Sequence, residues 1–573
     1  MPGSDPNEEG LRALGRAIDG GDEPRAPRSA PTREGRGRHG RARPPRKHRW
    51  LKRILISLTA LVLLAIAGGA GYAWYLNHKV HRIAVKGLSP GTTTGTDAGT
   101  ENILMVGSTT RCGLAHQTAA YGLCTQGVTG VNSDVVMVLH LNPKNKSVSV
   151  LSLPRDLFVP NARSTGAYKI DAALYQGPSQ LVAVIEEDFG IPIQHYVELN
   201  FDTFAAVVTA LGGITMYFPD RIFDRYSGLR VLTPGCHHLN GVQALQVVRA
   251  RHLQYWQTGD PTTYPYTWPQ TPQSDLARIL RDHEFLRVLA TEVGKRGLGN
   301  PSTDFSLLKA VLPDLTVDSG FSLSDFVNLA LTYHHININQ APQLTLPVLV
   351  GTFGTYVYKG GDFGYIEFPT EPLDHNVVDK FLGVSSDTNT MTGLPLPAPS
   401  SVKVSVVDGT NTATTTTATA AQLSHLGFDV VGTGATTPPA QQSETLVTYS
   451  QRTPTDEAAA QLVADSMSGA VVLDYGPTTN GAQVTVTTGT SFAVDATAPG
   501  ASPAQSTTTT SAAPSTPTAA TVASTSTSTP ATGTGNQNAL SSGFATPSPS
   551  NPGLTPWDPR ACPAGVTGNA GNW

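Results

Sequence analysis

Arginine and aspartate residues stand next to the ends of apolar runs that have the pattern of buried strands. The run "SVSVLSLPRDLFVP" leads directly into Arg155 and Asp156, and "VNSDVVMVLH" places Asp134 just before another apolar run. Ligands of α/β sheets bind at such strand ends. "VVRARH" adds Arg249 and Arg251, which would lie on one side and clamp one anion if this stretch is extended, and would diverge if it is helical.

These residue types favour phosphate chemistry. Guanidinium groups match phosphate oxygens with two parallel hydrogen bonds, and carboxylates with hydroxyls hold Mg²⁺, which keeps most of its ligands as water and substrate phosphates. The chain has no P-loop and no GxGxxG motif, which argues against a nucleotide. The pattern therefore predicts a phosphate or pyrophosphate ligand held with a divalent cation, as in phosphoryl transfer.

A long helix is predicted over residues 274–295, with its charges gathered on one side. At 100° per residue, one arc of this helix is mainly apolar, and the neighbouring arc carries Asp275, Arg278, Arg281 and Asp282. Periodicity alone is typical of a solvated face with pairs four residues apart. His283 falls on the apolar side and is interpreted as a hydrogen-bonded core histidine.

Two regions have the composition needed to position such residues. Residues 101–382 carry nearly all the aromatic residues and alternate strand-like runs with helical stretches, which predicts a layered α/β domain with helices packed on a central sheet. Residues 401–494 repeat the alternation on a smaller scale and are interpreted as a second small α/β domain. The aromatic and proline-rich segment 255–273 is interpreted as either a lid over the site or a loop that contacts lipid.

The N-terminal part predicts a membrane anchor. Residues 1–53 hold 14 Lys and Arg against 7 Asp and Glu without apolar periodicity, which indicates a disordered basic arm. Residues 54–76 form a stretch of 23 residues without a charge, and about 20 suffice to span a bilayer. Because the basic residues precede this stretch, we expect a single-pass protein of the cell membrane, with its N-terminus cytoplasmic and its main domains extracellular. Attraction to anionic membrane lipid accounts for the arm without nucleic acid.

Segments of low complexity separate and follow the predicted domains. Pro, Gly, Ser and Thr are frequent in them and charges are few, so they cannot bury a core. They are interpreted as a linker at 77–100, a second linker at 383–400 and a Ser/Thr/Pro/Ala-rich tail at 495–573.

The four cysteines all lie on the predicted outer side, where disulfides persist. Cys112 and Cys124 would close a short loop, and Cys236 with Cys562 would then tie the end of the chain to the main domain. Spacing alone leaves this connectivity open. No pair has the CxxC spacing of a zinc site.

Several blocks in order resemble one known family. "NILMVGSTTR", "NSDVVMVLHL", "VSVLSLPRDLFV", "YKIDAALYQGP", "PIQHYVELNFDTFAAVVTALGGI", "LNGVQALQVVRARH" and "SDLARILRDHEFL" are together similar to the LytR-CpsA-Psr family over roughly residues 101–300. "VVDGT", "LSHLGF" and "VTVTTG" in residues 401–494 resemble the small domain often appended to actinobacterial members. This resemblance implies a mixed-sheet α/β fold with a long apolar groove for a polyprenyl chain.

The resemblance also implies an activity. It indicates Mg²⁺-dependent transfer of a glycopolymer from a polyprenyl-(pyro)phosphate carrier to peptidoglycan through a phosphodiester linkage. Two alternatives are an enzyme of the same fold that acts mainly as a pyrophosphatase, and a non-catalytic wall-binding or regulatory protein of the transcriptional attenuator type. The actinobacterial features suggest arabinogalactan or a teichoic-type polymer as the cargo.

Family roles can be carried over to matching positions. The resemblance implies that Arg155, Arg249 and Arg251 grip the pyrophosphate and that Asp134 is a Mg²⁺-linked acid. The remaining substrate-binding residues that it implies are Asp156, Lys169, Asp275, Arg278 and Arg281. The charged arc of the 274–295 helix thereby becomes a predicted functional face.

Three positions depart from the family pattern. Thr109 stands where the family has an aspartate, Asn132 replaces an arginine, and Asp282 with His283 replaces glutamines. Losing a carboxylate should weaken Mg²⁺ binding, although the Thr109 hydroxyl is still expected to be a metal ligand, directly or through water. Arg111 is the expected substitute for the phosphate donor lost at Asn132.

Overall fold

The computed structural model describes most of the chain after Ala70. The described residues are 68, 71–72, 74–75, 77–91, 99–112, 114, 123–261, 264–270, 274–296, 315–333, 341–351, 356–410, 412–435, 443–495, 544–545, 554, 557–563 and 566. The chain divides into two compact units, Met1–Ala70 and Gly71–Trp573, and the fold described below belongs to the second. The predicted basic arm 1–53 lies outside the described residues, as does most of the predicted span 54–76. Among the residues described, no helix combines the length and the apolar character needed to cross a membrane.

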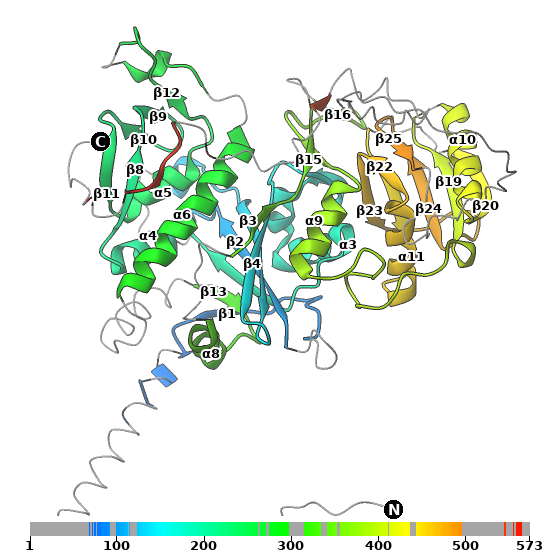
Figure 1. Ribbon diagram of the computed structural model, residues 1–573, viewed down its shortest axis with the longest axis horizontal. Coiled ribbons are helices and arrows are strands. Elements are labelled where there is room, and N and C mark those ends of the chain that lie inside the picture. The colour runs from blue at the N-terminus through cyan, green and yellow to red at the C-terminus, as the bar shows by residue number, and fades with distance from the viewer. Residues whose placement is uncertain are drawn as a thin grey trace, which may run out of the picture. The chain divides into compact units, whose positions relative to one another are not determined.

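A seven-stranded mixed sheet forms the centre of the first domain (Figure 1). Its central strand β2 pairs in parallel with β7 and antiparallel with β3, and β3 pairs antiparallel with β4. The strands, in order across the sheet, are β1 (His81–Ile83), β13 (Thr316–Asp318), β7 (His195–Leu199), β2 (Glu101–Ser108), β3 (Ser133–Asn142), β4 (Ser147–Leu153) and β14 (Gln343–Thr345). The predicted central mixed sheet is confirmed.

One face of the sheet is covered by α3 (Pro178–Phe189) and α9 (Leu373–Leu382). Leu104 and Val106 of β2 point to this face and are fully buried, whereas Met105, which lies between them, points to the other face. The strands are therefore apolar on both sides, as in sheets with helices on both faces. A hairpin of β5 (Phe158–Arg163) and β6 (Gly166–Lys169) and the 3-10 helix η3 (Ile170–Gln176) pack beside α3.

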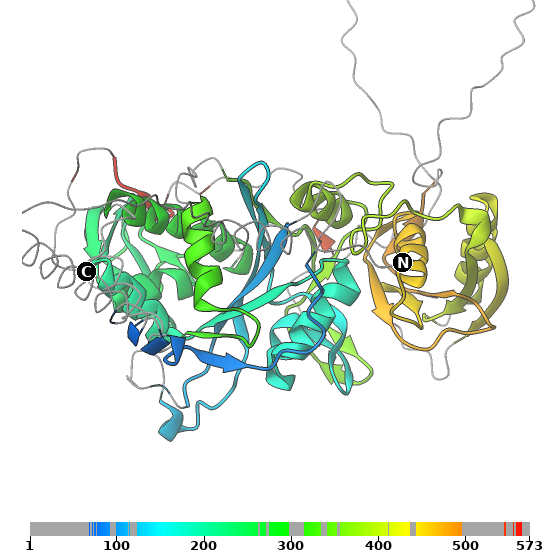
Figure 2. The same cartoon turned by 90° about the horizontal axis from the view of Figure 1, so that it is seen from below.

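The opposite face carries α4 (Phe201–Ala210), α5 (Gly241–Arg249) and α6 (Ser274–Arg296), as Figures 1 and 2 show. Asn200 and Asn240 cap α4 and α5 by accepting hydrogen bonds from backbone N–H groups of the first turn. A Cβ added to Gly241 would lie 2.3 Å from the Ala205 carbonyl oxygen, so a glycine is needed for α5 to pack this closely on α4. This packing places the end of α5, and with it Arg249, beside the sheet.

Smaller sheets extend the first domain and hold pieces of the tail. The strands are β8 (Ile214–Phe218), β9 (Ile222–Asp224), β10 (Leu229–Val231), β11 (Gly235–Leu239), β12 (Gln254–Tyr255), β15 (Val348–Gly351), β16 (Val357–Tyr358), β17 (Gly361–Asp362), β18 (Glu367–Pro369), β26 (Phe544–Ala545) and β27 (Arg560–Ala561). Helix α8 (Leu323–Tyr333) packs beside β13 and β1. Because β26 pairs with β15 and β27 with β8, the predicted tail 495–573 contributes strands to the first domain.

Both predicted disulfides are confirmed. Cys112 is bonded to Cys124, and Cys236 on β11 is bonded to Cys562, next to β27. The second bond ties the end of the tail to the first domain, where Trp557 also stacks on Tyr255 with ring centroids 4.4 Å apart. The described cysteines are all paired.

The second domain has its own five-stranded sheet. Its order is β20 (Asp429–Ala435), β19 (Lys403–Asp408), β24 (Val484–Thr488), β21 (Thr445–Tyr449) and β23 (Val471–Tyr475). Helices α10 (Ala413–His425) and α11 (Pro454–Ala464) pack on it around a core of valine, leucine and alanine residues, and β22 (Met467–Gly469) pairs with β25 (Phe492–Val494). A second small α/β domain is confirmed.

The structure differs from the sequence interpretation in both predicted linkers. Within 77–100, His81–Ile83 form the edge strand β1, and Val80 is buried against β13, so this segment is part of the first domain. Within 383–400, Asn389 is buried and bonded to Gln461 of α11. Such short contacts could not be recognised in a low-complexity sequence, because a single short strand or a single buried side chain produces no hydrophobic periodicity.

Candidate active site

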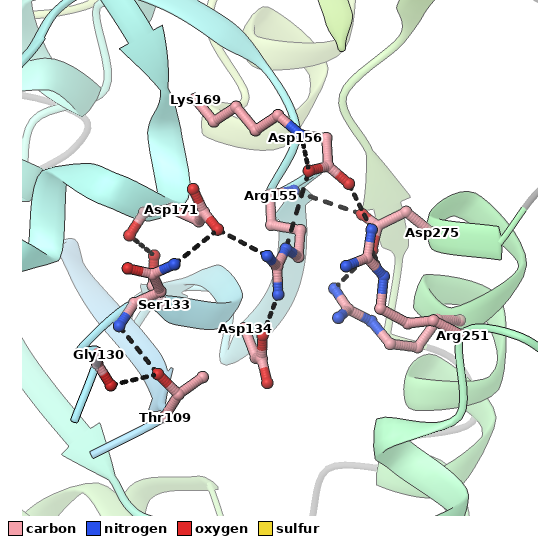
Figure 3. Close-up of polar contacts among 12 residues, drawn as sticks. Thr109, Gly130, Ser133, Asp134, Arg155, Asp156, Lys169, Asp171, Arg251 and Asp275 are labelled. Carbon is pink, nitrogen blue, oxygen red and sulfur yellow. Dashed lines mark hydrogen bonds and ion pairs between the residues drawn. The ribbon is translucent and has the colours of Figure 1, made fainter. Parts of the chain in front are cut away.

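Arg155 is the centre of a charged cluster at the end of β4 (Figure 3). Its guanidinium points between two carboxylates, donating from Nη1 to Asp134 at the start of β3 and from Nη2 to Asp171 of η3 at 2.7 Å. Asp156 follows it in the chain, and its Oδ1 lies 3.9 Å from the Arg155 Nε atom. The sheet thus brings together the two acids and the arginine that come from separate strand ends.

A second arginine completes the cluster from the helical side. Asp156 is 2% exposed and binds both Lys169 Nζ, at 3.0 Å, and Arg251. The Nε atom of Arg251 also lies 3.2 Å from Asp275 Oδ1 at the start of α6. We refer to Asp134, Arg155, Asp156, Lys169, Asp171, Arg251, Asp275 and Arg278 as the active-site cluster.

The charged arc of α6 faces inward. Asp275, Arg278, Arg281 and Asp282 are 1%, 2%, 1% and 4% exposed, so this arc is not the solvated face that periodicity alone would indicate. Arg278 Nη2 lies 3.0 Å from Asp275 Oδ1, and its Nε atom lies 3.7 Å from Asp282 Oδ2. Arg281 pairs with Asp558 of the tail at 3.2 Å and also donates to the Ala250 carbonyl, between Arg249 and Arg251.

Charges in the cluster shift the pKa values of its members. Burial alone would lower the pKa of Arg155, but Asp134, Asp171 and Asp156 raise it above its ordinary value. Burial would raise the pKa of Asp156, and Arg251, Arg155 and Lys169 instead hold it below its ordinary value. Burial raises the pKa of Asp171 to about 6 although Arg155 opposes the shift. The cluster therefore favours the charged form of Arg155 and the ionised form of Asp156.

An apolar cavity of about 190 Å³ opens beside this cluster. It lies between the β2–β3 face of the sheet and the helices α4, α5 and α6, with aromatic and aliphatic side chains along most of its wall: Met105, Met137, Phe201, Phe204, Val208, Leu245, Val248, Phe285, Leu286 and Leu289. Its polar lining includes Asp134, Arg249, Arg278 and Asp282. A ligand with a charged head and an apolar chain fits such a site.

Arg249 and Arg251 diverge, because α5 ends at Arg249, the backbone is extended at Ala250, and Arg251 lies beyond the helix. Arg249 is the last residue of α5 and lies over the Phe201 ring, 4.6 Å from its centroid, on the cavity wall. Arg251 turns to Asp156 and Asp275 in the cluster. Arg111 also lies over Phe201, at 5.4 Å, and donates to the Thr109 carbonyl at 2.9 Å. Two arginines thus stack on one aromatic ring between the cavity and the charged cluster.

Thr109 lies in a loop-to-loop contact. Its hydroxyl donates to the Gly130 carbonyl at 3.3 Å and accepts from the Asn132 N–H at 2.9 Å, as Figure 3 shows in part. The Asn132 side chain donates to Asp171 at 3.3 Å. Asn132, which stands where the family has an arginine, is therefore connected to Arg155 through the Asp171 carboxylate. His283 is bonded to Ser152 Oγ at 2.7 Å and is 4% exposed, which confirms its interpretation as a core histidine.

Two acids of the site were not singled out from the sequence. Asp171 lies in the quoted block "YKIDAALYQGP", two residues after Lys169, and this acid following a strand was the available signal. Glu367 is fully buried on β18 and receives a hydrogen bond from Tyr365 Oη at 3.4 Å. Burial raises its pKa well above the ordinary value, with Asp275 and Asp156 adding to the shift. Glu367 lies outside the sequence blocks that resemble the family, so no motif in the sequence indicated it.

Two acids at the wall of the apolar cavity suit a divalent cation. Asp134 and Asp282 line the same cavity, and both carboxylate oxygens of the buried Asp282 lack a hydrogen-bond partner. Among the described residues, no group of three His, Cys, Asp or Glu ligands converges at this site. Such a pair of acids fits Mg²⁺, which takes most of its ligands from water and substrate phosphates.

Comparisons with known proteins place both domains. The chain matches the LytR_cpsA_psr family over residues 76–365 and the LytR cell envelope-related transcriptional attenuator family over residues 401–492. A probable cell wall biosynthesis protein LcpB from Corynebacterium glutamicum is 32% identical over 246 residues, which are 42% of this chain and 54% of that protein. The polyisoprenyl-teichoic acid–peptidoglycan teichoic acid transferase TagV from Bacillus subtilis is 33% identical over 35% of this chain and 51% of that protein. The chain thus spans about half the length of these two relatives.

Solved structures of similar proteins cover about half of the chain. A LytR-Csp2A-Psr enzyme from Actinomyces oris is 26% identical, covering 47% of this chain and 88% of its own, with a TM-score of 0.37. TagV from Bacillus subtilis is 23% identical, covering 50% of this chain and 98% of its own, with a TM-score of 0.36.

Proposed function

Because the chain belongs to the LytR-CpsA-Psr family, we propose that it transfers a glycopolymer from a polyprenyl-(pyro)phosphate carrier to peptidoglycan. The observation that carries this proposal is the apolar cavity lined by Arg249, Arg278 and Asp134 next to the charged cluster. The cavity suits a polyprenyl chain, and the arginines suit the pyrophosphate that follows it. Relatives named as teichoic acid transferases support the same reaction class.

In the proposed reaction, a hydroxyl of peptidoglycan attacks the phosphorus attached to the polymer. A new O–P bond forms, the bond between the two phosphates breaks, and polyprenyl phosphate leaves. Such transfers depend on positioning and on neutralising charge. Arg155 and Arg251 are held by Asp134, Asp171 and Asp156, so their guanidiniums need little reorganisation when the phosphates arrive.

Asp134 and Asp282 would hold a Mg²⁺ ion at the cavity wall. When bound, Mg²⁺ neutralises phosphate charge and helps to align the reacting groups. Thr109 stays a proposed ligand that would have to act alongside its bonds to Gly130 and Asn132.

We also propose that residues 54–76 anchor the chain in the cell membrane, with residues 1–53 cytoplasmic and the two domains outside. The support is the 23-residue uncharged stretch and the basic residues that precede it. An anchor of this kind would hold the cavity near lipid-linked substrate.

The test is a transfer assay with the full chain in detergent, a polyprenyl-pyrophosphate-linked saccharide and peptidoglycan. Arg155→Ala should lower transfer on the order of 100-fold or more, because a preorganised charge beside the phosphates is lost. Arg287→Ala, whose side chain is 39% exposed and pairs with Glu284 of the same helix, is the matched control and should keep full activity. Transfer unaffected by Arg155→Ala would contradict the proposal, and phosphate released equally without acceptor would identify a pyrophosphatase instead.

A further inference from the structure

A second group of titratable side chains lies far from the active-site cluster, where the two domains meet. Glu371 stands between β18 and α9, and His375 lies in α9 of the first domain. Asp465 is the residue directly after α11 of the second domain. The backbone of Glu371 exchanges two hydrogen bonds of 3.0 Å with Gly469, so this meeting point is fixed by main-chain contacts. We refer to Glu371, Asp374, His375, Asp379 and Asp465 as the interface cluster.

Three of these residues converge as metal ligands do. One ligand atom from each of Glu371, His375 and Asp465 lies within 4.8 Å of the others, the one such convergence among the described residues. His375 Nδ1 is 3.4 Å from Asp465 Oδ1. Ligands held about 2 Å from a cation lie roughly 3–3.5 Å from one another, so small side-chain movements would close the site.

The oxygens that face this point lack partners. Glu371 Oε2 and both carboxylate oxygens of Asp465 make no hydrogen bond, although Glu371 is only 9% exposed and the Asp465 side chain only 7%. No lysine or arginine is among the described residues that line the adjoining cavity. Buried carboxylates without a cationic partner are costly, and a bound cation would remove that cost.

The surroundings provide room and orientation for a cation. The adjoining cavity of about 30 Å³ is large enough for one or two water molecules that would complete the coordination. His375 Nδ1 faces Asp465 at this point, and a histidine ring nitrogen is a common ligand of transition metals.

The outer contacts of His375 also suit a ligand. Its Nε2 atom lies 3.4 Å from Asp379 Oδ1 and 2.9 Å from the Gln461 amide nitrogen. Gln461 is itself fixed, since its Oε1 accepts from Asn389 and its Nε2 donates to the Thr388 carbonyl. The Gln461 amide donates to His375 Nε2 in this arrangement. When Nδ1 binds a cation, Nε2 carries the ring proton and Asp379 accepts it, and the Gln461 N–H group has to move out of line with Nε2.

We propose that Glu371, His375 and Asp465 bind a divalent transition-metal cation of the Zn²⁺ or Mn²⁺ class that ties the second domain to the first. The imidazole ligand favours this class over Mg²⁺ and Ca²⁺, which prefer oxygen ligands alone. Because the ligands come from both domains, the cation stabilises their contact in addition to the pairs Arg452–Glu187 and Asn161–Asp474. This site is independent of the proposed transfer reaction.

The experiment uses the full chain in detergent, stripped of metal with a chelator. Calorimetry with Zn²⁺ and with Mn²⁺ should find a site that Asp465→Asn and His375→Gln weaken at least tenfold, and these cations should raise the Tm of the unaltered chain by several degrees. Asp429→Asn, at an exposed aspartate of the same domain, is the matched control and should bind as the unaltered chain does. Pulsed electron paramagnetic resonance of bound Mn²⁺ should show one imidazole nitrogen that His375→Gln removes.

Clear results would overturn the proposal. The proposal is contradicted if neither Zn²⁺ nor Mn²⁺ changes the Tm, or if both ligand variants bind these cations as the unaltered chain does. Tighter binding of Mg²⁺ or Ca²⁺ at this site would also contradict it. If a ligand variant fails to fold, Asp379→Asn replaces it. That variant removes no ligand, so it should fold and bind the cations more weakly, and unchanged affinity would count against the site.

Discussion

The active-site cluster and the interface cluster are both buried groups of carboxylates, but their charges are compensated differently. In the active-site cluster, Arg155 and Arg251 bind acids from three separate segments. In the interface cluster, the titratable partner nearest to Asp465 is a histidine that burial keeps neutral. The first cluster is therefore preorganised for an anion, whereas the second has an excess of negative charge that suits a cation or bound protons.

Asp156 of the active-site cluster and two carboxylates of the interface cluster should respond to pH in opposite directions. The pKa of Asp156 is held below its ordinary value, so the stability it contributes is present above the pKa of the unfolded chain and is lost as pH falls through the folded-state pKa. Burial raises the pKa of Asp374 and of Asp379 to about 6. Their contribution is greatest below the unfolded pKa and is lost as pH rises towards and through 6.

Asp156→Asn should give the largest effect on stability. Removing this charge leaves Arg251, Arg155 and Lys169 without their shared acid, and breaking a buried pair costs about 3–5 kcal/mol of the free energy of unfolding. Denaturant unfolding should show this cost in full at pH 7 and a smaller one below about pH 4, where Asp156 of the unfolded chain takes up a proton. Asp429→Asn, an exposed control, should change the free energy of unfolding by less than about 0.5 kcal/mol. A cost that did not depend on pH would indicate lost packing rather than lost charge.

Thr109→Asp tests whether the loop after β2 belongs to the charged cluster. The new carboxylate could still accept from the Asn132 N–H and would add a negative charge near Asp134. If this corner holds Mg²⁺, the concentration for half-maximal transfer activity should fall about tenfold, equal to about 1.4 kcal/mol. Thr109→Ser keeps the hydroxyl and should leave the Mg²⁺ dependence as it is. No change in the aspartate variant would show that the corner is structural.

The sequence predicted most of the active-site cluster because its members follow apolar strands or share a helix face. Arg155, Asp156 and Asp134 were found in this way, and the sheet brings them together as expected. Glu367 was missed because it enters through a contact between distant segments that strand periodicity does not encode. For Asp171 a signal was available, an acid two residues after Lys169 at the end of a strand, and it was not used. The resemblance placed Arg281 among the substrate-binding residues, whereas the structure pairs it with Asp558, 277 residues further along, and with the Ala250 carbonyl.

The interface cluster could not have been predicted from the sequence. Glu371, His375 and Asp465 belong to two domains, and nothing in their spacing differs from ordinary surface acids. Their burial follows from how the segment around Asn389 and the turn at Gly469 dock the second domain on the first. The predicted linker at 383–400 concealed this contact, because docking depends on a few specific hydrogen bonds and not on composition.

Asp188→Asn should give the smallest change and the opposite sign to Asp156→Asn. The Asp188 side chain lines the same cavity as the interface cluster and is 4% exposed. Both of its carboxylate oxygens lack a hydrogen-bond partner. Burial raises its pKa well above the ordinary value, so the folded chain is less stable once pH rises above the pKa of the unfolded chain.

Asparagine has nearly the same shape without the charge, so we expect Asp188→Asn to raise the free energy of unfolding at pH 8 by about 1 kcal/mol and to change it little at pH 4. Denaturant unfolding in chelator at both pH values measures this difference. Destabilisation at pH 8 would mean that the Asp188 carboxylate has a cationic partner, and the contrast between the two clusters would then fail at this residue. The increase in the free energy of unfolding at pH 8 could instead disappear when Zn²⁺ or Mn²⁺ is added. That result would support the contrast between the two clusters, because the cation would already have compensated the negative charge that the asparagine removes.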